Sequence, residues 1–73
     1  MNTNIWTDRG DSAAREDIRA GHTGPWDRGA VLAHLGIATE DDTDAVACGL
    51  AGDDLDTAQR AAHAGYARAM EGA

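Results

Sequence analysis

Few side chains in this sequence could carry out catalytic chemistry. There is one serine, Ser12, and one cysteine, Cys48, and neither has a neighbouring histidine in a recognisable nucleophile motif. Carboxylates are abundant, but a general acid needs a carboxyl group in a dry pocket, and these carboxylates occur in polar, glycine-rich surroundings. The segment Gly21-His22-Thr23-Gly24 has no lysine after a glycine and is no phosphate-binding loop. We therefore predict that the chain is not an enzyme.

Metal ligands are also sparse. The candidates for zinc are His22, His34, His63 and Cys48. No two of them have the spacing of zinc ligands. Asp42-Thr43-Asp44 and Asp54-Leu55-Asp56 resemble the start of a calcium-binding loop, but both lack its glycine and its closing glutamate. We expect no metal ion and no cofactor.

The acidic side chains are the distinctive chemical feature. The formal net charge is −7, and all six basic residues are arginine. Between Gly29 and Gln59 there is no basic residue, but there are seven acidic ones: Glu40, Asp41, Asp42, Asp44, Asp53, Asp54 and Asp56. Six acids and six arginines balance elsewhere, so the whole net charge comes from this stretch. A protein so charged repels DNA and anionic membranes, and we expect it to bind neither directly.

These acids have two interpretations. Carboxylates at helix N-termini are favoured by about 0.3–1 kcal/mol each, and two helices are expected to begin near residues 40 and 53. Four acids within five residues exceed what a helix start requires, however. Closely spaced negative charge also resembles a nucleic-acid backbone, which carries one charge per ~1.7 Å of duplex. The second interpretation is a DNA-mimic inhibitor, of the kind phages use against nucleases, CRISPR complexes or polymerase subunits, bound to a basic surface of a nucleic-acid-binding protein.

The composition limits the scaffold that can position these side chains. Apolar residues make up 42% of the chain, but sixteen are alanine, only nine are leucine, isoleucine or valine, and none is phenylalanine. Alanine favours helices and makes a thin core. We predict an all-α fold, a compact bundle of three to four short helices. Residues 11–73 would form a single small domain, preceded by an extended or irregular segment over residues 1–10.

Local signals place the helices at residues 13–20, 25–35, about 40–51 and 55–70. Pro25 suits a first helical turn. Gly36 is expected to form a left-handed cap that brings Ile37 against Leu32. The segment Thr39-Glu40-Asp41-Asp42 is typical of a capping box for the third helix.

Two helices have a predicted inward face. In the third helix, Val46 and Leu50 are expected to point inward. In the last helix, the inward face consists of Leu55, Ala58, Ala62, Tyr66 and Ala69. Next to that face is a stripe of small residues, along which another helix could approach closely: Ala61, Gly65 and Ala69.

Two partial resemblances occur in the centre of the chain. Ala33-His34-Leu35-Gly36-Ile37 followed by Val46 resembles the apolar skeleton of a helix-turn-helix, but the next helix would open with acids, the wrong sign for a phosphate backbone. Leu35-Gly36-Ile37 with Asp54-Leu55-Asp56-Thr57-Ala58 is similar to the pattern of ubiquitin-associated three-helix domains. This second resemblance implies a compact three-helix core.

An apolar interface is the alternative to the acidic one. Under that interpretation the chain is a helical adaptor or a self-associating module, and a homodimer could form. Trp6 and Trp26 would anchor the partner, because large aromatic residues dominate many interfaces. The stripe Ala61, Gly65 and Ala69 would then be a dimer seam.

The cellular compartment follows from general features. A single cysteine cannot form an internal disulfide, which suits a reducing cytosol. There is no leader pattern and no apolar run near the ~20 residues that span a bilayer. We expect a cytoplasmic protein.

Overall fold

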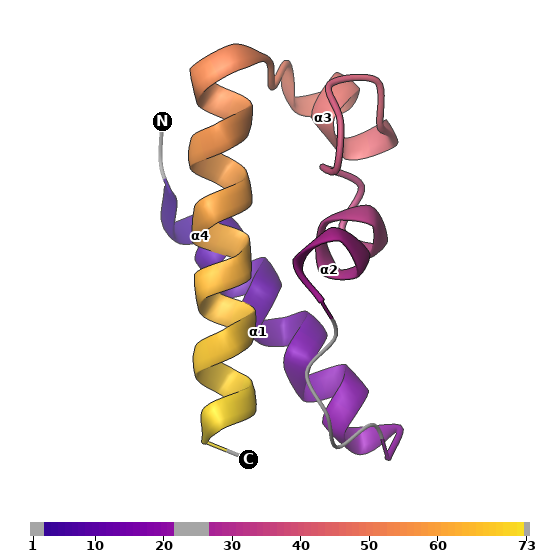
Figure 1. Ribbon diagram of the computed structural model, residues 1–73, viewed down its shortest axis with the longest axis vertical. Helices are drawn as coiled ribbons and strands as arrows, with labels where there is room; N and C mark the ends of the chain where they lie inside the picture. Colours follow the sequence, from indigo (N-terminus) through magenta and orange to yellow (C-terminus); the bar gives the residue numbers. More distant parts are fainter. Residues whose placement is uncertain (1–2, 22–26, 73) are drawn as a thin grey trace.

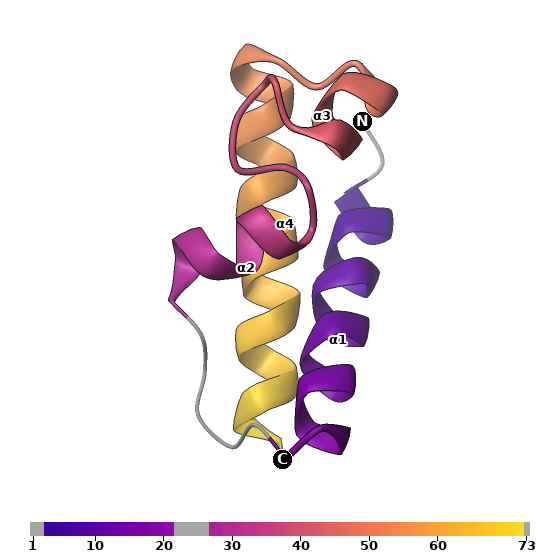
Figure 2. The same ribbon diagram turned by 90° about the vertical axis from the view of Figure 1, so that its right-hand side faces the viewer.

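Helices account for all the regular structure in the described part of the chain. A computed structural model describes residues 3–21 and 27–72. Over these residues there is no strand, and the helices are α1 (Thr3–Arg19), α2 (Arg28–His34), α3 (Thr43–Cys48) and α4 (Gly52–Glu71). The long helices α1 and α4 run in the same direction and cross, while α2 and α3 lie to one side of them (Figure 1, Figure 2). The predicted all-α bundle is confirmed.

Residues 3–10 belong to α1, which corrects the expectation of an extended or irregular segment over residues 1–10 for all but residues 1–2, which lie outside the described part of the chain. The helix begins at Thr3, far before the predicted start at residue 13. The residues that it buries are Trp6, Gly10, Ala13 and Ala14. Their spacing of three and four residues is that of a helix face. Because the glycine contributes no apolar side chain, this periodicity is not recognisable in the sequence.

Two glycines bring the backbones of α1 and α4 into contact where the helices cross. A Cβ atom at Gly10 would overlap the carbonyl group of Ala62, and one at Gly65 would overlap the carbonyl group of Thr7. Inside a helix, glycine is less favourable than alanine by about 1 kcal/mol. The close approach of the two backbones is the physical reason for glycine at both positions.

The core consists of two clusters of buried apolar residues. The first contains Trp6, Leu32, Ile37, Ala45, Leu50, Ala58 and Ala62. The second contains Ala13, Ala14, Val31 and Tyr66. The predicted inward face of the last helix is confirmed, with Ala58, Ala62 and Tyr66 buried and Leu55 and Ala69 partly buried against the clusters. In this helix the apolar period alone locates the core.

The second helix starts later than predicted. It begins at Arg28, after Asp27, whose side chain accepts a hydrogen bond from the backbone N–H of Ala30 at 2.9 Å. An aspartate at this position satisfies one of the unpaired amides of the first turn. Pro25 and Trp26, where the sequence suggested the start, lie outside the described residues.

The predicted glycine cap at the end of α2 is confirmed. Gly36 has a φ of 76°, the left-handed conformation that favours glycine. The backbone N–H of Ile37 donates to the carbonyl of Leu32 at 3.0 Å, and both side chains lie in the first core cluster. This cap turns the chain away from α2 toward the acidic stretch.

The third helix is shorter than predicted, ending at Cys48 instead of continuing to residue 51. Gly49 ends it, with a left-handed φ of 66°. Leu50 is buried as predicted, but Val46 is 63% exposed, and Ala45 takes the inward position. The prediction for Val46 was wrong, because Ala45 is the side chain of α3 that joins the first core cluster. The next helix, α4, begins at Gly52, earlier than the predicted residue 55.

Candidate acidic binding surface

The predicted acidic residues come from three adjoining elements. These are the turn at residues 39–42, α3, and the beginning of α4, which all lie in the upper part of Figure 1 and Figure 2. We call the following set the acidic end: Glu40, Asp41, Asp42, Asp44, Asp53, Asp54 and Asp56. Its members differ in what their carboxylates contact, and these contacts separate two groups.

Asp42 stabilises the turn that precedes α3. Its Oδ2 accepts hydrogen bonds from the backbone N–H groups of Ala38 at 2.8 Å and Thr39 at 3.3 Å. The hydroxyl of Thr39 lies 3.3 Å from its Oδ1. Asp42 is also the residue before α3, but its side chain makes no capping bond to that helix. The predicted capping box is thus present only in part: Asp42 accepts from the backbone N–H of Thr39, as the fourth residue of such a box does, but this bond closes a turn, and α3 begins only at Thr43.

Two further carboxylates are paired with arginine. Asp44 Oδ2 lies 3.5 Å from Nη1 of Arg9, which comes from α1 and also covers the ring of Trp6, with 4.6 Å from its guanidinium carbon to the ring centroid. Asp56 Oδ2 lies 3.0 Å from Nε of Arg60, one turn further along α4. Both pairs are solvent-exposed, and such pairs contribute about 0–1 kcal/mol to stability. They do neutralise part of the charge.

The remaining four acids are Glu40, Asp41, Asp53 and Asp54. All four are exposed, and their carboxylates form no hydrogen bond or ion pair with the described residues. Asp53 and Asp54 lie in the first turn of α4, where the helix dipole stabilises negative charge. The acidic end therefore presents four unneutralised carboxylates from two elements.

Two residues of the alternative apolar interface, Trp6 and Gly65, are buried within the molecule. Trp6 is 4% exposed and belongs to the first core cluster. Gly65 is buried against Thr7 of α1, and Ala61 and Ala69 are partly buried against the core. Gly65 thus packs inside the molecule, where α1 and α4 cross, and the stripe as a dimer seam stays a prediction. Trp26 lies outside the described residues.

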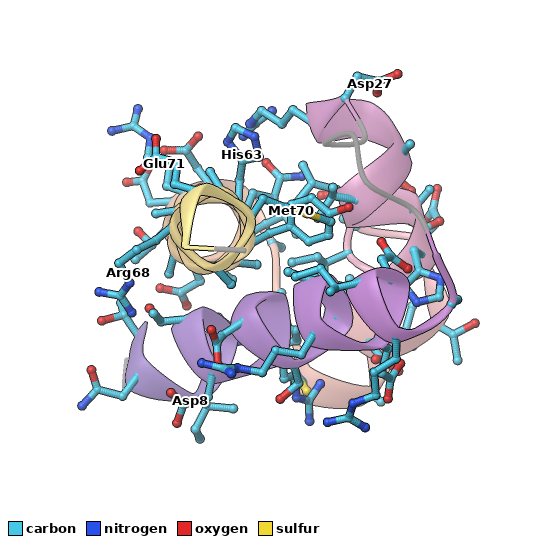
Figure 3. All side chains as sticks on the ribbon, turned by 90° about the horizontal axis from the view of Figure 1, so that it is seen from below. Asp8, Asp27, His63, Arg68, Met70 and Glu71 are labelled. Carbon is cyan, nitrogen blue, oxygen red and sulfur yellow. The ribbon has the colours of Figure 1, made fainter. Side chains whose placement is uncertain are left out.

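The opposite end of the molecule has a mixed charge. A hollow of about 600 Å³ lies between the C-terminal halves of α1 and α4, with Arg15, Arg19 and Arg68 among its lining residues. Asp8 and Asp11 also line it, and Asp11 is paired with Arg15 at 2.9 Å. Figure 3, seen from this end, shows Arg68 and Glu71 pointing outward from α4, while Met70 points between α4 and its neighbours. No single sign of charge dominates here.

Other kinds of site find little support in the described part of the chain. There, no group of three or more histidine, cysteine or acidic side chains could hold a metal ion. None of the described helices is long and apolar enough to cross a membrane. Cys48 is a free, exposed thiol.

Comparison with known proteins gives no relative. The chain matches no protein-family model, and no curated protein or solved structure is significantly similar to it. Function therefore has to be inferred from the surface of the molecule.

Proposed function

We propose that this chain is a protein-binding inhibitor whose acidic end occupies a basic, nucleic-acid-binding surface of a partner protein. The observation that carries the proposal is the set of four exposed carboxylates that have no partner among residues 3–21 and 27–72: Glu40, Asp41, Asp53 and Asp54. Their neighbours Asp44 and Asp56 already hold the arginines that approach them. A cation that reaches this surface from another protein therefore meets carboxylates that remain available.

Electrostatics explain why such a surface would compete with nucleic acid. A net charge of −7 in a small domain raises the rate of encounter with a basic groove. The contacts between the carboxylates and the basic groove replace those that phosphates of the nucleic acid would make. Binding weakens as salt screens the charges, because the Debye length is about 8 Å at physiological ionic strength. Inhibition requires no catalytic group, which agrees with the scarcity of nucleophiles in the sequence.

A charge-neutralising variant tests the proposal. In one variant Asp41, Asp53 and Asp54 are replaced by asparagine, which leaves Asp42 to hold its turn. The matched control carries Asp8→Asn, Glu16→Gln and Glu71→Gln, which are exposed carboxylates of α1 and α4. Each variant removes three charges from the net of −7.

The wild type and both variants are immobilised and exposed to bacterial lysate at low and high salt. We expect the wild type and the control to retain a nucleic-acid-binding protein that added duplex DNA or high salt releases, and the acidic-end variant to lose it. If the two variants lose the partner to the same extent, only the net charge matters and not the position of the acids. Retention that neither salt nor DNA affects would contradict the proposal.

A further inference from the structure

A hollow beside the acidic end combines apolar and acidic lining. Its volume is about 420 Å³, within the range of about 300–1,000 Å³ that is typical of ligand pockets. Residues of α1, of the end of α3 and of the first turn of α4 surround it, including Ile5, Trp6, Arg9, Cys48, Leu50 and Asp54. Segments distant in the sequence therefore build one concave surface next to Asp53 and Asp54.

The apolar part of this hollow is accessible to a partner. Ile5 is 51% exposed, although the other large apolar residues that line the hollow, Trp6 and Leu50, are buried. Cys48, at the end of α3, is also exposed. An aliphatic side chain placed here would contact Ile5 and would remove its apolar surface from water, which is favourable.

The charged part of the hollow favours a cation beside that aliphatic group. Among the described residues that line the hollow, Arg9 is the basic one, and it is already held between Asp44 and the ring of Trp6. The carboxylate of Asp54 has no such partner in the described part of the chain, and neither has that of its neighbour Asp53. The rim thus keeps a negative charge while its own arginine is neutralised.

We infer that this hollow receives an aliphatic side chain from a basic segment of the partner, whose arginine or lysine residues face Asp53 and Asp54. The inference rests on the proposed function and adds to it an apolar anchor. A nucleic-acid backbone has no counterpart of such an anchor. The partner is therefore distinguished from other basic proteins by a leucine-like residue within its basic surface.

Two synthetic helical peptides test this inference. Each has about 18 residues, long enough to form a helix, and is rich in arginine and alanine. One carries a central leucine, and the other carries alanine there. Binding is measured by titration calorimetry, and the rate at which a maleimide alkylates Cys48 reports occupancy of the hollow. We expect the leucine peptide to bind about tenfold more tightly and to slow the alkylation.

Single variants separate the apolar anchor from the charge. Ile5→Ser should abolish the preference for leucine. Ile18→Ser is the matched control, because Ile18 lies on the same helix, is 37% exposed and lines the other hollow. This control should keep the preference, and Asp53→Asn with Asp54→Asn should weaken the binding of both peptides. Circular dichroism checks that α1 persists in each variant.

Different results would contradict the apolar anchor and the proposed function. Equal affinity of the two peptides, or a preference for leucine that survives Ile5→Ser, would overturn the anchor, while dependence on Asp53 and Asp54 would leave the proposed function standing. Alkylation of Cys48 that the leucine peptide does not slow would also overturn the anchor. Binding that does not change when Asp53 and Asp54 are neutralised would count against the proposed function itself.

Discussion

The two long helices and the central segment, residues 36–51, are held in place by different kinds of contact. Helices α1 and α4 touch backbone to backbone through Gly10 and Gly65, so their geometry leaves no room for one added methyl group. The central segment is held by the buried side chains of Ile37, Ala45 and Leu50, and individual polar contacts fasten it further. The side-chain amide of Gln59 donates to the carbonyls of Ile37 at 2.9 Å and Ala38 at 3.0 Å.

This difference bears on how the surface can change. Close packing of backbones is intolerant of substitution, whereas separate hydrogen bonds can be lost one at a time. Four of the acidic residues, Glu40, Asp41, Asp42 and Asp44, therefore lie in the more tolerant region, whereas Asp53, Asp54 and Asp56 lie at the beginning of α4. The effects of substitutions in the two regions should consequently differ in size, and five substitutions test this ranking.

The largest effect is expected from Gly65→Ala. Helix propensity alone would stabilise α4 by about 1 kcal/mol. The new Cβ would instead collide with the carbonyl of Thr7, and separating the helices should cost about 2–3 kcal/mol, a large part of the stability of so small a domain. Urea unfolding followed by circular dichroism measures this change. Ser12→Ala, at an exposed position of α1, is the control, and a stabilised Gly65→Ala protein would refute the close crossing.

A smaller effect is expected from Gln59→Ala. Two part-buried carbonyls, those of Ile37 and Ala38, would lose their donor, at a cost of about 1–2 kcal/mol. The loss should be local, so amide hydrogen exchange should accelerate in residues 36–51 more than in α1 and α4. Uniform acceleration over the whole chain would mean that the central segment does not open separately.

The acidic end itself offers a paired comparison. Asp42→Ala removes the acceptor for the amides of Ala38 and Thr39 and should cost about 1 kcal/mol. Asp41→Ala removes an exposed carboxylate without a partner and should stay within about 0.5 kcal/mol of the wild type. Thermal unfolding of the two variants side by side measures the difference. Equal losses would show that the division of the acids into two groups is wrong.

A small effect is also expected from Arg9→Gln, which removes the contacts with Asp44 and the ring of Trp6. Both Arg9 and Asp44 are nearly half exposed, so the pair is weak, and we expect a loss of about 0.5 kcal/mol. Adding ~1 M salt should shrink the difference from the wild type, because exposed charges are screened. The melting temperatures of both proteins at low and high salt test this. A difference that salt leaves unchanged would assign the effect to packing.

Much of the fold follows from the sequence by itself. Alanine content and apolar period determine the helical class and the inward residues Ala58, Ala62 and Tyr66. Gly36 and Ile37 specify how α2 ends. The concentration of negative charge between Gly29 and Gln59 is likewise a property of the sequence. Each of these features depends on residues within one or two helical turns, where local geometry is enough.

Only the tertiary structure decided how the same residues are used. The burial of Trp6 and the start of α1 at Thr3 depend on Gly10 meeting Ala62, a residue more than fifty positions away. The pairing of Arg9 with Asp44 likewise joins distant parts of the chain and determines which carboxylates remain available. Such contacts depend on the angle and depth at which helices cross, and a short-range pattern carries no information about either.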